Sequence, residues 1–192
     1  MIRIGVVGDI GSGKSYVAKK FGYPVFNADN EVAQLYKKNR KCYKKLKKAL
    51  PNYIISFPVK KKEICGAIIG NKNNLKKIVT IVHPDIRRAL NNFVKKNKKK
   101  EIVILDIPLL IENKINKKKD IIIFVDAPKK EINKRLKKKF NNNEKILSKF
   151  RKLQLAVELK KKHSDFIIKN NFKHNSIKKN VKRIIKNILL ND

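Results

Sequence analysis

The residues whose types and spacing point most directly to chemistry lie near the start of the chain. Residues Gly8 to Ser15 form the pattern G-x-x-x-x-G-K-S, which is typical of a nucleotide-binding phosphate loop. Its glycines let successive backbone N–H groups point inward and make an anion site at a helix N-terminus. Lys14 adds a positive charge for the terminal phosphates, and the Ser15 hydroxyl can ligate Mg²⁺. A Gly/Ser turn is the alternative, but an apolar run before the motif and a helical pattern after it favour ATP or GTP binding.

Aspartates follow two of the apolar runs that predict buried strands. Asp29 comes shortly after the run 23–26, and Asp106 comes directly after the run 102–105. Ligands of parallel sheets bind at the carboxyl ends of the strands, so we expect both carboxylates beside the phosphate loop. There Asp106 could orient Mg²⁺ through water, and Asp29 could accept a proton from an attacking hydroxyl. Capping of a turn or a helix is the alternative role of either aspartate.

Basic residues form two further candidate groups. His83 and Arg87 flank a proline that can open a helix, so they could present donors to a phosphate or a phosphopantetheine arm. A capping histidine beside a solvated arginine is the alternative. Residues 135–154 alternate basic helical sequence with an Asn-rich loop. This segment could close over a nucleotide as a lid, or it could be a solvated basic hairpin.

Strands and helices that must position these groups alternate along the chain. The patterns predict strands over residues 4–7, 23–26, 102–105, 121–125 and 165–168. They predict helices over residues 16–21, 31–50, 63–69, 75–82, 85–97, 129–139, 145–163 and 176–190. The alternation indicates an α/β fold with a parallel sheet. Because one helix suffices for a crossover between parallel strands, residues 31–97 predict an inserted helical block that covers a substrate.

Composition narrows the classes of partner. The 192 residues suffice for one domain with a core. A net charge of +35 would ordinarily suggest a nucleic acid or an anionic membrane. Here the lysines are spread along the chain with abundant Asn and Ile, all three having A/T-rich codons, and the lysine runs lack aromatic residues for base stacking. We therefore expect no specific nucleic-acid partner. We also expect no membrane partner and a cytoplasmic location, because no apolar run approaches the roughly 18 residues of a membrane span and no signal peptide precedes the first strand.

Taken together, these motifs resemble those of the dephospho-CoA kinase family. The likeness covers nearly the whole chain, and its His-Pro and Asp-Ile-Pro-Leu-Leu elements are more specific than the phosphate loop. It rests on the phosphate loop, Ala28-Asp29, His83-Pro84-x-Ile86-Arg87, Asp106-Ile107-Pro108-Leu109-Leu110-x-Glu112, Val125-Asp126-Ala127-Pro128, Arg151-x-x-Gln154 and Asp165-Phe166-Ile167-Ile168-x-Asn170.

The resemblance implies a fold, a reaction and a set of site residues. The fold would be a P-loop kinase-like, three-layer α/β domain over residues 1–192, with a parallel β-sheet, a helical CoA-binding region at 31–97 and a lid at 135–154. The reaction would be ATP-dependent phosphorylation of the ribose 3′-hydroxyl of dephospho-CoA with Mg²⁺, by a monomer or weak oligomer. The implied catalytic residues are Asp29 and Lys14, and the implied metal ligands are Ser15 and Asp106. The remaining implied residues are Gly11, Ser12, Gly13, Lys14, Ser15, Tyr16, Lys139 and Asn170 for ATP; Asp29, His83, Arg87, Pro108 and Leu109 for the second substrate; and Arg135, Lys139, Arg151 and Gln154 in the lid.

Some residues depart from the family pattern. Asp9 and Phe172 stand where the family usually has glycine, Tyr16 replaces a threonine, and Lys139 stands where we expect the lid arginine. Two alternatives stay open: another P-loop small-molecule or nucleotide kinase, and a P-loop ATPase switch that binds a macromolecular partner. A GTPase is disfavoured because the sequence has no Asn-Lys-x-Asp motif.

Overall fold

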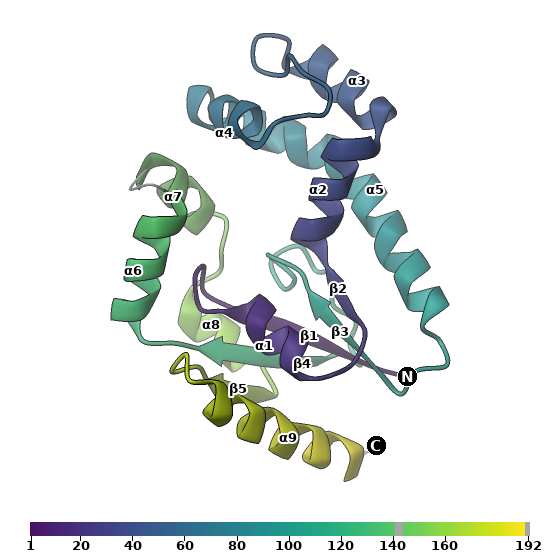
Figure 1. The fold of residues 1–192 in the computed structure, drawn as a ribbon, viewed down its shortest axis with the longest axis vertical. Coiled ribbons are helices and arrows are strands. Elements are labelled where there is room, and N and C mark those ends of the chain that lie inside the picture. Colours follow the sequence, from purple (N-terminus) through teal and green to yellow (C-terminus); the bar gives the residue numbers. More distant parts are fainter. Residues whose placement is uncertain (141–143, 191–192) are drawn as a thin grey trace. The chain divides into compact units, whose positions relative to one another are not determined.

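The computed structural model describes residues 1–140 and 144–190 (Figure 1). The chain divides into two compact units. One contains residues 1–27 and the chain from residue 97 onward, and the other contains residues 28–96. In the part of the chain that the structure describes, no helix is long and apolar enough to cross a membrane.

A parallel five-stranded sheet forms the centre of the first unit, in the order β2-β3-β1-β4-β5. Its strands are β1 (Ile2–Gly8), β2 (Val25–Asn27), β3 (Ile102–Asp106), β4 (Ile121–Asp126) and β5 (Phe166–Lys169). Every residue of β3 is buried, as expected for a parallel strand that is covered on both faces. The predicted parallel sheet is confirmed, and its register places Asn27 beside Asp106 at the carboxyl ends of β2 and β3.

Helices cover both faces of this sheet (Figure 1). Helices α1 (Lys14–Lys20) and α9 (His174–Leu190) contribute to one core with alternate residues of the strands. That core includes Ile4 and Val6 of β1 and Ile177 and Val181 of α9. The other face of β1 carries Gly5, where an added Cβ would lie 2.4 Å from Leu110 Cδ2, so the chain after β3 packs closely there.

Basic helices follow the fourth strand: α6 (Lys129–Phe140), α7 (Glu144–Arg151) and α8 (Val157–Lys162). The prediction of one helix over 145–163 is wrong, because residues between Arg151 and Val157 leave the helix. Tertiary hydrogen bonds compete with helical ones at this break: the Leu155 N–H donates to Glu112 Oε1 at 3.1 Å. The predicted Asn-rich loop at residues 141–143 lies outside the described residues.

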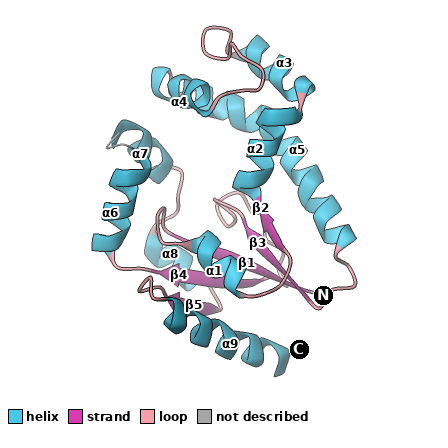
Figure 2. Ribbon diagram, in the orientation of Figure 1, coloured by secondary structure: helices cyan, strands magenta, loops and turns pink. Residues whose placement is uncertain are grey.

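Residues 28–96, all of them described, fold as helices joined by loops (Figure 2). These helices are α2 (Ala28–Lys38), α3 (Arg40–Ala49), α4 (Lys61–Gly70) and α5 (Asn74–Lys96). The prediction of one helix over 31–50 is wrong, because Asn39 caps a new helix by accepting a hydrogen bond from the Cys42 N–H at 2.8 Å.

The predicted break at His83-Pro84, between helices over 75–82 and 85–97, is also wrong. Pro84 lies inside α5, which runs from Asn74 to Lys96 and is 23 residues long. A proline removes one helical hydrogen bond and crowds the carbonyl four residues earlier. Buried residues on both sides of it, Val82 and Leu90 among them, outweigh this local cost by packing one continuous helical face against the neighbouring helices.

Candidate nucleotide and acceptor sites

The phosphate loop joins β1 to α1, and its glycines adopt conformations that side chains oppose. Gly13 has φ of 87° and would bring a Cβ within 2.5 Å of Asn170 Nδ2. Gly8 has φ of 152° and would bring a Cβ within 2.7 Å of the Val125 carbonyl oxygen. Both positions therefore need glycine for the backbone conformation and for the close approach of neighbouring atoms.

Asn170 fixes the loop from the far end of the chain. The residue is 1% exposed, and its Nδ2 donates to the Ser12 carbonyl at 2.7 Å. Its own backbone N–H donates to the Asp126 carbonyl at 2.6 Å, and its Oδ1 accepts from the Phe172 N–H at 2.9 Å. Phe172 has a left-handed φ of 61°, and its ring lies beneath the guanidinium of Arg135 at 4.0 Å. The chain after β5 thus holds the phosphate loop in place.

Lys14 lies folded over the loop. Its Nζ donates to the carbonyl oxygens of Asp9 at 2.8 Å and of Gly8 at 3.2 Å. The Asp9 carboxylate accepts from the Ile10 N–H at 2.7 Å, so this departure from the family pattern occupies one of the loop's own donors. Ser12 Oγ is buried and has no hydrogen-bond partner among the described residues. A buried hydroxyl left without a partner in a glycine-rich loop at a helix N-terminus suits a site that accepts an anion.

Two oxygen groups are candidates for a metal ion. Asp106 ends β3, is 2% exposed and accepts a hydrogen bond from the Asn27 side-chain amide. Ser15 is exposed in the first turn of α1. The described residues contain no group of three or more His, Cys, Asp or Glu side chains that could hold a metal by themselves. A carboxylate and a hydroxyl without a full protein cage fit Mg²⁺, which keeps water and takes further ligands from nucleotide phosphates.

The chain between β3 and Glu112 lies beside the loop. It helps to line a small cavity together with Gly8 and Lys14, and it contributes Ile107, Leu109, Leu110 and Glu112 to that lining. Leu109 has φ of 60°, which a branched side chain rarely adopts and which often marks a functional position. Pro108 is exposed next to it.

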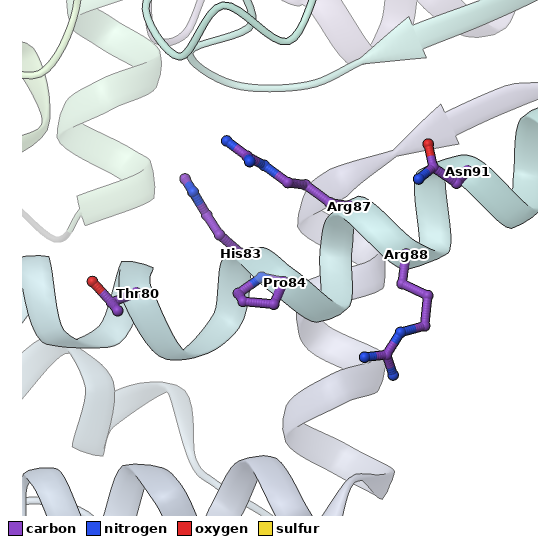
Figure 3. Close-up of a pocket in the computed structure, with 6 residues that line it drawn as sticks. All are labelled: Thr80, His83, Pro84, Arg87, Arg88 and Asn91. Atoms are coloured by element: carbon purple, nitrogen blue, oxygen red, sulfur yellow. The ribbon is translucent and has the colours of Figure 1, made fainter.

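His83 and Arg87 lie one turn apart on α5 in the helical unit. With Thr80, Pro84, Arg88 and Asn91 they line a hollow of about 560 Å³, and the two side chains project to the same side of the helix while Arg88 points away (Figure 3). Burial lowers the pKa of His83, and the charge of Arg87 lowers it further. His83 is therefore mostly neutral at pH 7, and Arg87 supplies the positive charge of the pair.

Comparison with known proteins decides the family. The dephospho-CoA kinase profile matches residues 2–176. The chain belongs to the dephospho-CoA kinase family. Proteins named dephospho-CoA kinase from Wolbachia pipientis wMel and Bartonella quintana are each 33% identical to it over 193 residues, covering 98% of both chains.

Solved structures agree with the fold. A protein from Thermus thermophilus superposes with a TM-score of 0.74 at 28% identity, covering 99% of this chain and 97% of that one. Shikimate kinase from Acinetobacter baumannii superposes with a TM-score of 0.51 at 13% identity, which shows a shared P-loop kinase fold alone.

The structure distributes the residues that the family resemblance implies over both units. Gly11 to Lys14, Asp106, Leu109 and Asn170 gather around the carboxyl ends of β1, β3 and β5 in the first unit. Tyr16 is exposed on α1. Asp29 is exposed in the first turn of α2, and its carboxylate has no hydrogen-bond or ion-pair partner within residues 28–96.

The residues expected in a lid lie along α6, α7 and the chain that follows. Leu136 of α6 packs on the phosphate loop, since a Cβ at Gly11 would lie 3.1 Å from its Cδ2. Arg151 Nη2 donates to Asn133 Oδ1 at 3.5 Å. Lys139 belongs to α6, but its side chain lies outside the described residues.

One residue beside the loop has no role in the sequence analysis. Lys160 is 2% exposed, and its Nζ donates to Gln154 Oε1 at 2.7 Å and to the Gly8 carbonyl at 3.4 Å. It also pairs with Glu112 Oε1 at 3.5 Å. No sequence signal distinguishes it, because it opens a run of three lysines whose last member, Lys162, is exposed.

Proposed function

We propose that this protein transfers the terminal phosphoryl group of ATP to the ribose 3′-hydroxyl of dephospho-CoA, giving coenzyme A and ADP. The observation that carries the proposal is a phosphate loop with glycines in left-handed conformations, locked by Asn170, in a chain of the dephospho-CoA kinase family. The plain ATPase alternative lacks an observation of its own, since nothing in the described residues favours it over this family.

The phosphate loop supplies the ATP site in this proposal. Backbone N–H groups of Gly11 to Ser15 face the phosphates, and the Lys14 ammonium leaves the loop carbonyls for the terminal phosphates. Asp106 and Ser15 would hold Mg²⁺, which when bound neutralises charge on the phosphates. Asn170 keeps the loop in register with the chain after β5, where Arg135 and Phe172 stack.

The acceptor groups are proposed on separate grounds. Asp29 is exposed, carries no partner within its unit and follows β2 by two residues, so it is free to accept the proton of the ribose hydroxyl as general base. Arg87, with neutral His83 beside it, would bind a phosphate of dephospho-CoA, and Pro108 and Leu109 would contact the same substrate. Residues 31–97 are then the CoA-binding region.

The proposal also includes a lid, a cellular location and an oligomeric state. Residues 135–154, with Arg135, Lys139, Arg151 and Gln154, would close over the nucleotide and exclude water. We place the protein in the cytoplasm as a monomer or weak oligomer. We propose no specific nucleic-acid partner, because the lysines are spread along the sequence.

An ADP-release assay tests the function. ATP is supplied with dephospho-CoA, pantetheine phosphate, nucleosides or nucleic acid, each with and without Mg²⁺. We expect strong ADP release only with dephospho-CoA and Mg²⁺, and a product that carries the new phosphate on its ribose. Equal turnover without an acceptor, or stimulation by DNA or RNA alone, would contradict the proposal and favour an ATPase switch.

A further inference from the structure

Two lysine ammonium groups converge on one carbonyl oxygen at the start of the phosphate loop. Lys14 Nζ lies 3.2 Å from the Gly8 oxygen, and Lys160 Nζ lies 3.4 Å from the same oxygen. The two lysines are far apart in sequence, since Lys160 is 152 residues from Gly8 and Lys14 belongs to the phosphate loop itself. Sharing one acceptor between two cations leaves excess positive charge beside the loop.

The lysines differ in how firmly they are held. Lys160 is the one buried lysine among those whose side chains the structure describes, with 3% of its side chain exposed. Gln154 and Glu112 bind its ammonium from two further directions, at 2.7 Å and 3.5 Å. Glu112 is itself fixed by the Leu155 N–H. Lys14 is only partly buried, and its Nζ rests on the carbonyls of Gly8 and Asp9. Lys160 is therefore the stationary partner.

Binding of a polyphosphate changes the number of donors to the Gly8 carbonyl. In the function proposed above, on which this inference rests, Lys14 turns from the loop carbonyls to the terminal phosphates. The Gly8 carbonyl then loses one donor at the base of the loop, and a carbonyl left there without a donor would oppose the movement. A donor that stays at Gly8 removes this opposition.

We propose that Lys160 is a positioning residue that keeps the Gly8 carbonyl hydrogen-bonded when Lys14 moves to the phosphates. It acts through Gly8 and touches no substrate. Its fixed ammonium holds that oxygen directed away from the anion site, so the N–H groups of the loop stay directed into it. Gln154, at the end of the proposed lid, and Glu112 hold the ammonium in this place.

The competing explanation is that Lys160 only neutralises the buried Glu112 carboxylate. Removing one member of a buried ion pair destabilises a protein whatever else the residue does, so a single substitution cannot separate the two explanations. A double substitution can. Lys160→Met with Glu112→Gln removes both charges, so the fold no longer contains an unpaired buried charge, while the Gly8 carbonyl still lacks Lys160 as a donor.

The test compares nucleotide affinity and melting temperature in the wild type, Lys160→Met, Glu112→Gln and the double variant. Lys162→Met is the matched control, because Lys162 is on the same helix, carries the same charge and is exposed. Dissociation constants are measured calorimetrically for ATP and for AMP, which lacks the terminal phosphates that draw Lys14 away.

We expect Lys160→Met to melt at a lower temperature than the wild type, and the double variant to recover most of that loss. ATP should nevertheless bind the double variant roughly tenfold to a hundredfold more weakly than the wild type, the factor for one buried carbonyl left without a donor. AMP affinity should change much less, and Lys162→Met should bind both nucleotides within about twofold of the wild type.

Three results would overturn the inference. They are wild-type ATP affinity in the double variant, an equal loss of ATP and AMP affinity, and an equal loss in Lys162→Met. If Lys160→Met does not fold, the double variant still decides. A wild-type protein that binds ATP but phosphorylates no dephospho-CoA would overturn the proposed function, and the nucleotide comparison would still test Lys160.

Discussion

Replacing Gly13 with alanine should destabilise the protein through two separate effects. Its φ of 87° is left-handed, which costs an L-residue about 1–2 kcal/mol. The new Cβ would also lie 2.5 Å from Asn170 Nδ2, so Asn170 must move and its 2.7 Å hydrogen bond to the Ser12 carbonyl breaks. Leaving these buried groups without partners costs about 1–3 kcal/mol more. The expected total is roughly 2–5 kcal/mol.

Gly22→Ala is the matched control for the backbone term. Gly22 has a similar φ of 76°, but an added Cβ there would meet no heavy atom within 4 Å. The free energy of unfolding of Gly22→Ala should therefore fall only by the cost of the left-handed backbone conformation, about 1–2 kcal/mol. Thermal melting should separate the two variants by about 2–4 °C for each kcal/mol that Asn170 contributes.

Ligand binding provides the second assay. Gly13→Ala should also bind ATP more weakly, because the loop loses its link to Asn170, whereas Gly22→Ala should bind ATP like the wild type. If both variants melt at the same temperature, the close contact between Gly13 and Asn170 does not exist in solution, and the reasoning is refuted.

Four further predictions concern the reaction, the pH dependence of stability and nucleic-acid binding. Asp29→Asn should lower kcat by roughly 10² to 10⁴ while ATP affinity and melting temperature stay close to the wild type, because the amide keeps the shape and removes the base; near-normal turnover in a folded variant would exclude the role. Lys14→Ala should instead weaken ATP binding and lower kcat together, by about 3 kcal/mol in kcat/KM, and unchanged kinetics would contradict it. Burial and Arg87 lower the pKa of His83 from 6.5, so the unfolded chain takes up this proton more readily. The contribution of neutral His83 to the free energy of unfolding is complete above pH 6.5, and it is lost as the pH falls toward the lower pKa of the folded state. Urea unfolding measured at a pH of about 8 and of about 5.5 gives the decrease in the free energy of unfolding on acidification. We expect this decrease to be larger in the wild type than in His83→Gln, and an equal decrease would contradict the prediction. Nucleic acid should bind weakly, without sequence preference and less as salt rises; a sequence-selective complex at physiological salt would refute the assignment of the +35 charge to composition.

Elements with a strong local pattern could be predicted from sequence. The buried run of β3 indicates a strand because β-branched and apolar residues suit a strand that is covered on both faces. The phosphate loop is equally local: the glycines that its backbone needs and the lysine that serves the phosphates lie within eight consecutive positions. Helix α9 follows from apolar residues at helical spacing, and Ile177 and Val181 are buried as that spacing predicts.

Helix boundaries were harder to predict from sequence, because tertiary packing competes with local conformational preference at these positions. Pro84 disfavours a helix interior by itself, yet α5 continues because its buried face packs on both sides of the proline. Asn39 interrupts a strongly periodic stretch instead, because its side chain accepts a hydrogen bond from the Cys42 N–H and so caps a new helix. Local preferences of about 1–3 kcal/mol are the same size as such packing and capping terms, so sequence alone does not decide between them.

The sequence by itself therefore determined the family, the parallel sheet and the phosphate loop, because each is recognised from motifs or runs whose own residues are close together in the chain. Only the tertiary structure decided that Asn170 binds Ser12 across 158 residues and that Lys160, rather than its exposed neighbour Lys162, is buried under Gly8. A lysine in a run of lysines carries no mark of its burial. Its place depends on whether distant groups, here Glu112 and the Gly8 carbonyl, can replace the water that its ammonium loses.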